Sequence, residues 1–162
     1  MDLILWRHAD AENSRPDAAR KLTERGCRQA RRVASWLKPR LPAGCKILSS
    51  PAERAQQTAA ALGIPFETLA ALGTDTNAID ALAAADWPGP GSVVIVGHQP
   101  TLGRIAAFLL SGRESDWSIA KGALWWLQDN YGEINLRAAL DPELIQPTPE
   151  RECPNSGLSE DS

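Results

Sequence analysis

Short apolar runs alternate with helical stretches along this chain, and that alternation limits its fold more than any other feature. The predicted strands cover residues 2–6, 46–49, 66–69 and 92–96, the last of which is β-branched and ends at Gly97. Short apolar runs bounded by turn residues are typical of buried parallel strands. Strands that alternate with helices indicate the α/β class. We therefore predict a three-layer α/β/α domain over residues 1–145 with a mainly parallel central sheet.

The helices between these strands carry start and stop signals of their own. Thr23 is the predicted N-cap of a helix from Glu24 to about Lys38, whose apolar residues recur at helical spacing. Pro51 suits the first turn of a helix that reaches Leu62. Further helices are predicted over residues 76–87 and 101–110, and a hairpin over residues 124–127 and 134–140.

Residues 146–162 differ from the rest of the chain in composition. They hold three of its 12 prolines, and four acidic residues against one basic residue. This composition is typical of a disordered acidic tail. The whole chain has a net charge of −3, so the remaining body is neutral. A neutral body lacks the basic surplus that phosphate-backbone binding favours, and we expect no nucleic-acid partner.

The sequence also predicts where the protein resides. No apolar run approaches the roughly 20 residues that a membrane helix needs, so we expect no membrane partner. The N-terminal stretch up to Arg7 is too short and too quickly charged for a signal peptide. Cys27, Cys45 and Cys153 are scattered and odd in number, which favours reduced thiols over a disulfide framework. Together these features predict a cytoplasmic protein.

Basic and imidazole side chains follow three of the predicted strands. Arg7 and His8 come directly after the first strand, Ser50 and Arg54 follow the second, and His98 follows the β-branched strand. The carboxyl ends of parallel strands meet at one edge of a sheet, where ligands of open α/β sheets bind. Arginine matches phosphate oxygens, neutral histidine has a free lone pair, and helix N-termini favour an anion. The arrangement predicts a phosphate site that contains an attacking nitrogen.

Less specific interpretations exist for each of these residues. A single histidine at a strand end is commonly a hydrogen-bonded structural residue, and Arg54 alone fits a solvated helix charge. The constellation is more specific than its parts, because a phosphate site requires several such groups at one sheet edge. A zinc site needs three or four ligands, and the two histidines of this chain without paired cysteine spacing do not supply them. We therefore expect no metal and no cofactor.

Four segments resemble the signatures of the histidine phosphatase superfamily. Residues 5–9 resemble its Arg-His-Gly signature, residues 49–58 its Ser-Pro-x-x-Arg-x-x-x-Thr block, and residues 96–100 its Gly-His-x-Pro block. Residues 22–30 match the Leu-Thr-x-x-Gly-x-x-Gln-Ala opening of its first helix. The segments occur in the right order, and the short chain resembles the SixA-type phosphohistidine phosphatase branch. The resemblance implies a phosphoglycerate mutase-like fold.

The resemblance also implies a role for each matching residue. His8 matches the nucleophile that is transiently phosphorylated, and Arg7, Arg54 and His98 match the groups that bind the phosphoryl oxygens. The implied protein is a metal-independent phosphohistidine phosphatase that acts on a phosphorylated protein domain or a small phosphorylated substrate. Ala9 stands where the signature has glycine, a small change that leaves the expected activity intact.

A general acid is the least defined part of the predicted site. Many superfamily members place a carboxylic acid in the pocket to protonate an alcohol leaving group. Asp75 is the nearest candidate, with Asp10 and Glu12 as others, but its place before a predicted helix also fits an N-cap. A phosphoramidate releases imidazole, which leaves more easily than an alkoxide, so a weak acid candidate favours an N–P substrate. The alternatives are a small-molecule phosphomonoesterase, which needs the acid, and a non-catalytic phospho-binding module.

The first predicted helix carries a basic face. Arg25, Arg28 and Arg32 share that face, and Lys21 precedes it. A solvated helix face is the simpler interpretation. A docking surface for an acidic phosphoprotein domain is the alternative.

Overall fold

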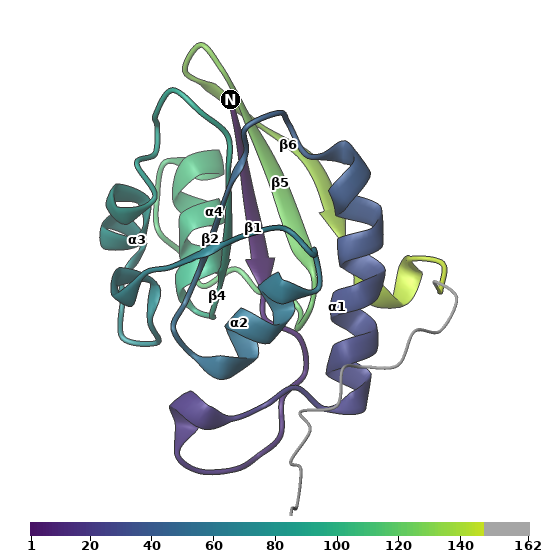
Figure 1. Ribbon diagram of the computed structural model, residues 1–162. Helices are drawn as coiled ribbons and strands as arrows, with labels where there is room; N and C mark the ends of the chain where they lie inside the picture. The colour runs from purple at the N-terminus through teal and green to yellow at the C-terminus, as the bar shows by residue number, and fades with distance from the viewer. Residues whose placement is uncertain (148–162) are drawn as a thin grey trace, which may run out of the picture.

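The computed structural model describes residues 1–147, in which one six-stranded sheet has helices on both faces (Figure 1). The strands are β1 (Asp2–Arg7), β2 (Lys46–Ser49), β3 (Glu67–Thr68), β4 (Val93–Gly97), β5 (Leu124–Asn130) and β6 (Glu133–Leu140), and they lie in the order β3-β2-β4-β1-β5-β6. β1 to β4 are mutually parallel, whereas β5 runs antiparallel to β1 and to β6. The prediction of a mainly parallel sheet that ends in a hairpin is confirmed.

The helices form the two outer layers of the fold. They are α1 (Glu24–Leu37), α2 (Glu53–Ala60), α3 (Ala78–Ala84) and α4 (Thr101–Ser111), with short 3-10 helices η1 (Asp17–Ala19), η2 (Lys38–Arg40), η3 (Ala70–Leu72) and η4 (Pro142–Leu144). Side chains of a strand alternate between the two faces of its sheet. Accordingly, Leu3 and Leu5 pack with α3 and α4, whereas Ile4 and Trp6 pack with α1 and α2. The three-layer α/β/α prediction is confirmed.

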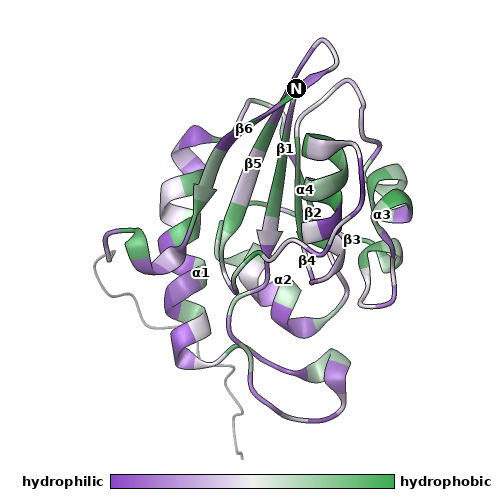
Figure 2. Cartoon of the chain, turned by 180° about the vertical axis from the view of Figure 1, so that it is seen from behind, coloured by the Kyte–Doolittle hydropathy of each residue, from purple (hydrophilic) through white to green (hydrophobic). Residues whose placement is uncertain are grey.

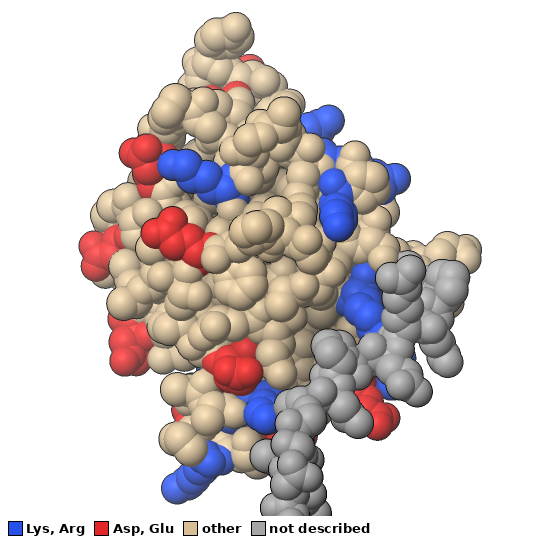
Figure 3. All heavy atoms as spheres, viewed as in Figure 1, with Lys and Arg blue, Asp and Glu red and all other residues tan. Residues whose placement is uncertain are grey.

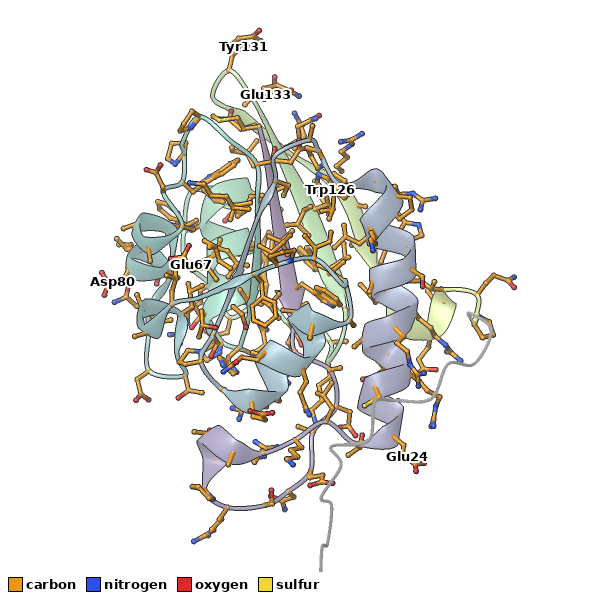
Figure 4. All side chains as sticks on the ribbon, viewed as in Figure 1. Glu24, Glu67, Asp80, Trp126, Tyr131 and Glu133 are labelled. Atoms are coloured by element: carbon orange, nitrogen blue, oxygen red, sulfur yellow. The ribbon has the colours of Figure 1, made fainter. Side chains whose placement is uncertain are left out.

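Hydropathy follows these layers. Figure 2 shows apolar colour along the central strands and polar colour on the outer side of α1. The apolar positions that predicted α1, among them Val33 and Leu37, are buried against the sheet. Trp126, which Figure 4 labels, lies between the sheet and α1, with its ring edge-on to Trp36 at a centroid separation of 6.2 Å.

Both ends of α2 and of α3 differ from the predicted ones, since α2 ends at Ala60 and α3 at Ala84. α2 begins at Glu53 rather than at Pro51, because Ala52 takes an extended conformation and becomes the N-cap. α3 begins at Ala78, because the Asn77 side chain accepts a hydrogen bond from the Asp80 backbone N–H and caps the helix there. It ends before Asp86, whose φ of 54° turns the chain away from the helix. Side-chain capping thus sets the start of α3, whereas the start of α2 follows from the extended backbone of Ala52 alone.

The predictions for the tail and for the cysteines are tested only in part by the described residues. Nearly all of the predicted tail, 146–162, lies outside the described residues. Cys45 is a free thiol, but Cys27 is disulfide-bonded, so the prediction of reduced thiols is wrong for Cys27. Scattered spacing along a sequence does not reveal which thiols meet in space, which is why the prediction failed. Within residues 1–147, no helix is both long and apolar enough to cross a membrane.

Candidate active site

The predicted site residues meet at the carboxyl ends of three neighbouring strands. β4 lies between β1 and β2 in the sheet, so the segments that follow these strands are adjacent. The His8 backbone N–H donates to the Gly97 carbonyl at 3.0 Å, which places His8 beside His98. The ring centroids of the two histidines are 5.1 Å apart. In Figure 1 this edge lies where the β1 arrow points, beside the start of α2 and above the η1 segment.

His8 has a defined tautomer. Its Nδ1 lies 2.8 Å from the Ala9 carbonyl oxygen. A carbonyl oxygen only accepts hydrogen bonds, so Nδ1 carries the ring proton and Nε2 keeps its lone pair. Burial lowers the pKa of His8 to about 3, with a further lowering from the charges of Arg54 and Arg7. The ring is therefore neutral at physiological pH, and its basic nitrogen is Nε2.

Thr58 and α1 hold the segment that follows His8. The Ala9 backbone N–H donates to the Thr58 hydroxyl at 3.0 Å, and that hydroxyl donates to the Arg54 carbonyl at 2.7 Å. One residue further on, the Asp10 N–H donates to the Gln29 side chain at 2.9 Å. Gly26 packs directly on the Asp10 backbone, where a Cβ would overlap the Asp10 carbonyl oxygen. The threonine of the second block and the Gly and Gln of the α1 opening thus support the nucleophile candidate.

Arg54 links His8 to a residue that the sequence analysis did not single out. Arg54 is only 4% exposed, and its Nε–H points at His8 Nε2 over 3.4 Å. The two terminal nitrogens donate to Asp17, one to its carbonyl oxygen at 2.8 Å and one to its carboxylate at 3.1 Å. Arg54 is separated from Asp17 by 37 residues, and no spacing rule in the sequence predicts such a contact. The only available signal was an acidic residue in the polar segment between His8 and α1.

Asp17 is ionised in this setting. Its carboxylate also accepts a hydrogen bond from Arg20 at 3.2 Å. The hydrogen bonds from Arg20 and Arg54 hold the pKa of Asp17 below its ordinary value. An ionised carboxylate accepts hydrogen bonds and does not donate a proton. Asp17 therefore orients cations, and it is not a general acid at neutral pH.

His98 and Arg7 each have one buried nitrogen without a partner. The Nε2 atom of His98 lies 2.7 Å from the Ser50 hydroxyl, and Arg7 donates one terminal N–H to the Ile119 carbonyl at 2.8 Å. Within residues 1–147, the Nδ1 of His98 and the Nε of Arg7 have no hydrogen-bond partner. Burial, with a smaller contribution from the Arg54 charge, lowers the pKa of His98 to about 4. Buried unpaired polar atoms are rare in folded proteins, so these two nitrogens indicate a polar ligand.

A cavity of about 530 Å³ adjoins this group. It is bounded by η1, by the turn that follows β2, and by residues 70–80. Its charged lining residues are all acidic, namely Asp17, Asp75 and Asp80. In the view of Figure 3, acidic side chains gather on the side of α3 and basic side chains on the side of α1.

The predicted acids have different surroundings. Asp75 is exposed and lines the cavity, but it is not an N-cap, because Asn77 caps α3. Burial opposes ionisation of Asp10, yet hydrogen bonds from Thr23 at 2.8 Å and Lys121 at 3.1 Å outweigh it and lower the pKa. The Asp10 carboxylate is therefore ionised and already paired with Thr23 and Lys121. Glu12 is exposed and contributes its backbone carbonyl to Arg20.

The basic face of α1 is partly paired. Arg25 and Arg32 both lie 3.5 Å from the Glu143 carboxylate, whereas Arg28 remains exposed. Shared exposed ion pairs of this kind stabilise a surface weakly. As for metals, residues 1–147 contain no group of three His, Cys, Asp or Glu side chains placed to hold an ion.

Comparison with known proteins gives consistent matches. Residues 3–73 match the family described as histidine phosphatase superfamily (branch 1). The chain is 34% identical over 122 residues to the phosphohistidine phosphatase SixA of Escherichia coli (strain K12), covering 69% of this chain and 76% of that protein. It is 33% identical over 130 residues to a SixA homolog of Haemophilus influenzae, covering 70% and 79% of the two chains. A solved structure of the protein histidine phosphatase SixA complexed with tungstate superposes with a TM-score of 0.75 at 29% identity, covering 88% of this chain and 97% of that one.

Proposed function

Because the chain belongs to the histidine phosphatase superfamily and is a phosphatase of the SixA type, we propose that it hydrolyses phosphohistidine through a phosphorylated His8. One observation carries the proposal. The unprotonated Nε2 of a buried, neutral His8 faces the Nε–H of Arg54 at 3.4 Å. A lone pair held among buried cationic and N–H groups suits attack on a phosphoryl group and little else.

The first step is transfer of the phosphoryl group to His8. The Nε2 lone pair attacks phosphorus in line, a P–Nε2 bond forms, and the bond between phosphorus and the substrate nitrogen breaks. A substrate imidazole that is protonated on its other nitrogen leaves as neutral imidazole, so no proton donor is needed. Arg7, Arg54 and His98 stabilise the charge on the equatorial oxygens. The unpartnered Nε of Arg7 and Nδ1 of His98 supply donors for those oxygens.

The second step is hydrolysis of the phosphorylated His8. Water attacks phosphorus and the P–Nε2 bond breaks. Phosphate is released and takes both hydrogens of the water with it. During this step Nδ1 keeps its proton, which it donates in a hydrogen bond to the Ala9 carbonyl oxygen. The leaving group is again a neutral imidazole, so the same donors serve both steps without a general acid. The relative solved with tungstate, a tetrahedral oxyanion, supports an oxyanion as the ligand of this chain too.

A small-molecule phosphomonoesterase is the second candidate. Its support is the cavity beside the site, in which Asp75 is exposed and accessible to a leaving group. An alkoxide needs protonation as it leaves, so this function makes Asp75 necessary. The partner of the protein is a phosphorylated protein domain in the first case and a small phosphorylated substrate in the second.

One experiment tests the proposal and separates the two candidates. The protein is mixed briefly with a phosphohistidine protein, with free phosphohistidine and with para-nitrophenyl phosphate, in the presence of a metal chelator. We expect acid-labile phosphate on His8 and fastest turnover of the phosphohistidine substrates. The His8→Ala variant should lose turnover on the order of 10⁴-fold or more while it stays folded. Turnover of the variant within tenfold of the parent would remove His8 as nucleophile, and an Asp75→Asn variant that is inactive only on the ester would favour the phosphomonoesterase.

A further inference from the structure

Ser50 lies behind His98, on the side away from the unpartnered ring nitrogen. It directly follows β2, and its backbone N–H donates to the Val96 carbonyl at 2.9 Å, which ties it to the strand that precedes His98. The side chain is fully buried, and its hydroxyl oxygen lies 2.7 Å from His98 Nε2. The same oxygen accepts a hydrogen bond from the Ala52 backbone N–H at 3.2 Å.

The two directions of the Ser50–His98 hydrogen bond leave different numbers of buried polar atoms unpaired. If His98 Nε2 carried the proton and donated, the Ser50 oxygen would accept two hydrogen bonds and its own hydrogen would have no acceptor. If the Ser50 hydroxyl donates instead, its hydrogen goes to Nε2 and its oxygen still accepts from Ala52. Each unpaired buried polar group is costly. Within residues 1–147 the first arrangement leaves both the Ser50 hydrogen and Nδ1 of His98 unpaired, whereas the second leaves only Nδ1, so the second is favoured. In that arrangement the ring proton of His98 must be on Nδ1.

We infer that Ser50 is a positioning residue whose hydroxyl holds His98 in the Nδ1–H tautomer, so that Nδ1 donates to a phosphoryl oxygen. The unpartnered state of Nδ1 within residues 1–147 is the second observation behind this inference. With the other tautomer, a lone pair on Nδ1 would face an anionic oxygen and repel it. The inference rests on the proposed phosphoryl transfer for its role, but not for the tautomer itself.

The charge state of His98 makes the tautomer matter. A protonated imidazole donates from both nitrogens, and a neighbouring hydroxyl would then be irrelevant to the donor on Nδ1. Burial lowers the pKa of His98 to about 4, so the ring is neutral where the enzyme works. A neutral ring has one N–H, and the contact with Ser50 decides which nitrogen has it.

The chain offers a direct test, because His8 and His98 are its only two histidines. Long-range ¹H–¹⁵N NMR at pH 7 on the ¹⁵N-labelled protein reports which ring nitrogen of each histidine is protonated. We expect Nδ1–H for both rings in the parent. In Ser50→Ala we expect His98 to shift toward Nε2–H while His8 stays unchanged. Ser50→Thr keeps the hydroxyl, and should retain the Nδ1–H signature.

Activity and anion binding give the second readout. Removing one oxyanion donor from a catalytic site typically lowers kcat by about 10²–10³, and a donor lost in only part of the molecules lowers it less. We expect Ser50→Ala to lower kcat roughly 10–100-fold and to weaken competitive inhibition by vanadate roughly tenfold. Ser49→Ala is the matched control, since Ser49 is an equally buried serine whose hydroxyl donates to the Ser50 carbonyl at 2.9 Å rather than to a histidine ring.

The parent spectrum alone is able to overturn the inference. If the His98 ring of the parent is protonated on Nε2, the inference is wrong, even if no variant folds. It is also wrong if the His98 signature is unchanged in folded Ser50→Ala. Failure of the proposed function is a different result. In that case the parent shows no phosphorylated His8 with a phosphohistidine substrate, while the tautomer and its dependence on Ser50 persist.

Discussion

At the scale of single residues, the contact between His8 and Arg54 determines how the site responds to substitution. The guanidinium has five N–H groups in a rigid fork, and here Nε points at the attacking nitrogen while the terminal nitrogens bind Asp17. An arginine held at both ends of its fork has little freedom to turn. In the proposed reaction, the orientation of the Arg54 N–H groups therefore matters as much as the positive charge.

Arg54→Lys tests this directional role. Lysine keeps the positive charge but loses the fork, so neither the contact with His8 nor the double contact with Asp17 survives. We expect kcat to fall about 10²–10³-fold, with weaker inhibition by vanadate or tungstate. Steady-state kinetics on a small substrate measures the effect. Arg28→Lys on the exposed face of α1 is the control and should stay near parent activity. Equal behaviour of the two variants would show that Arg54 is not part of the phosphoryl site.

Asp17→Ala tests the residue that holds Arg54 from the other side. The substitution removes the carboxylate that binds Arg54 at 3.1 Å but leaves the backbone carbonyl contact in place. Loss of orientation in a positioned group lowers kcat more than it changes folding, and we expect a decrease of roughly tenfold. Asp116→Ala is a matched control, because it breaks the exposed ion pair with Arg104. Higher activity in Asp17→Ala would instead mean that the carboxylate competes with the phosphoryl group for Arg54.

At the scale of elements, α1 contributes to the site without presenting any of the proposed reacting groups. Its Thr23 cap, its Gly26 contact and its Gln29 side chain all meet the backbone of Asp10, two residues after His8. Further along the same buried face, Val33 and Leu37 pack against the sheet. The helix thus fixes the distance between the sheet and the segment that carries the nucleophile.

Gly26→Ala tests this support. A Cβ at position 26 would overlap the Asp10 carbonyl oxygen, which is backbone and has no flexible end to move aside. Overpacking of this kind costs about 1–3 kcal/mol of unfolding free energy, and the shift of residues 9–10 should also lower kcat. Urea unfolding and kinetics of the variant measure the two effects. Gly91→Ala is the control, because no atom lies within 4 Å of a Cβ built there. A variant at position 26 as stable and active as that control would show that α1 does not brace the nucleophile.

These elements also show how far the sequence predicts the molecule. The strand ends that His8 and His98 follow, and the helix that carries Arg54, were predicted, because apolar period and turn residues are local signals. The contact of Asp17 with Arg54 was not, because it joins an irregular segment to a helix start 37 residues later. The start of α2 was predicted two residues early, since a proline is as compatible with the turn before a helix as with its first turn. Asp75 was weighed as an N-cap, a role that Asn77 takes because its amide reaches the Asp80 N–H.

At the scale of the whole molecule, the site places two titratable rings in the interior of the protein. Both histidines are more than nine-tenths buried, and burial lowers the pKa of His8 to about 3 and that of His98 to about 4. In the unfolded chain both titrate near 6.5. The unfolded state therefore binds protons first as the pH falls, and proton binding stabilises it relative to the folded state. Stability supplied by the neutral rings is complete above about pH 6.5 and decreases as the pH falls toward the folded pKa values.

This linkage predicts that the free energy of unfolding depends on pH, and that replacing one of the two histidines halves this dependence. Between pH 7.5 and 5.0 each histidine should cost about 2 kcal/mol of unfolding free energy, because one pH unit below the unfolded pKa corresponds to about 1.4 kcal/mol. Asp10 and Asp17 contribute little in this window, since their pKa values are lowered from an ordinary value that already lies below it. Urea unfolding at the two pH values measures the difference for the parent and for His98→Gln. We expect the difference to be about half as large in the variant, whatever its absolute stability. An equal difference in the two proteins would mean that His98 has the same pKa in the folded protein as in the unfolded chain, so that burial does not hold the ring neutral.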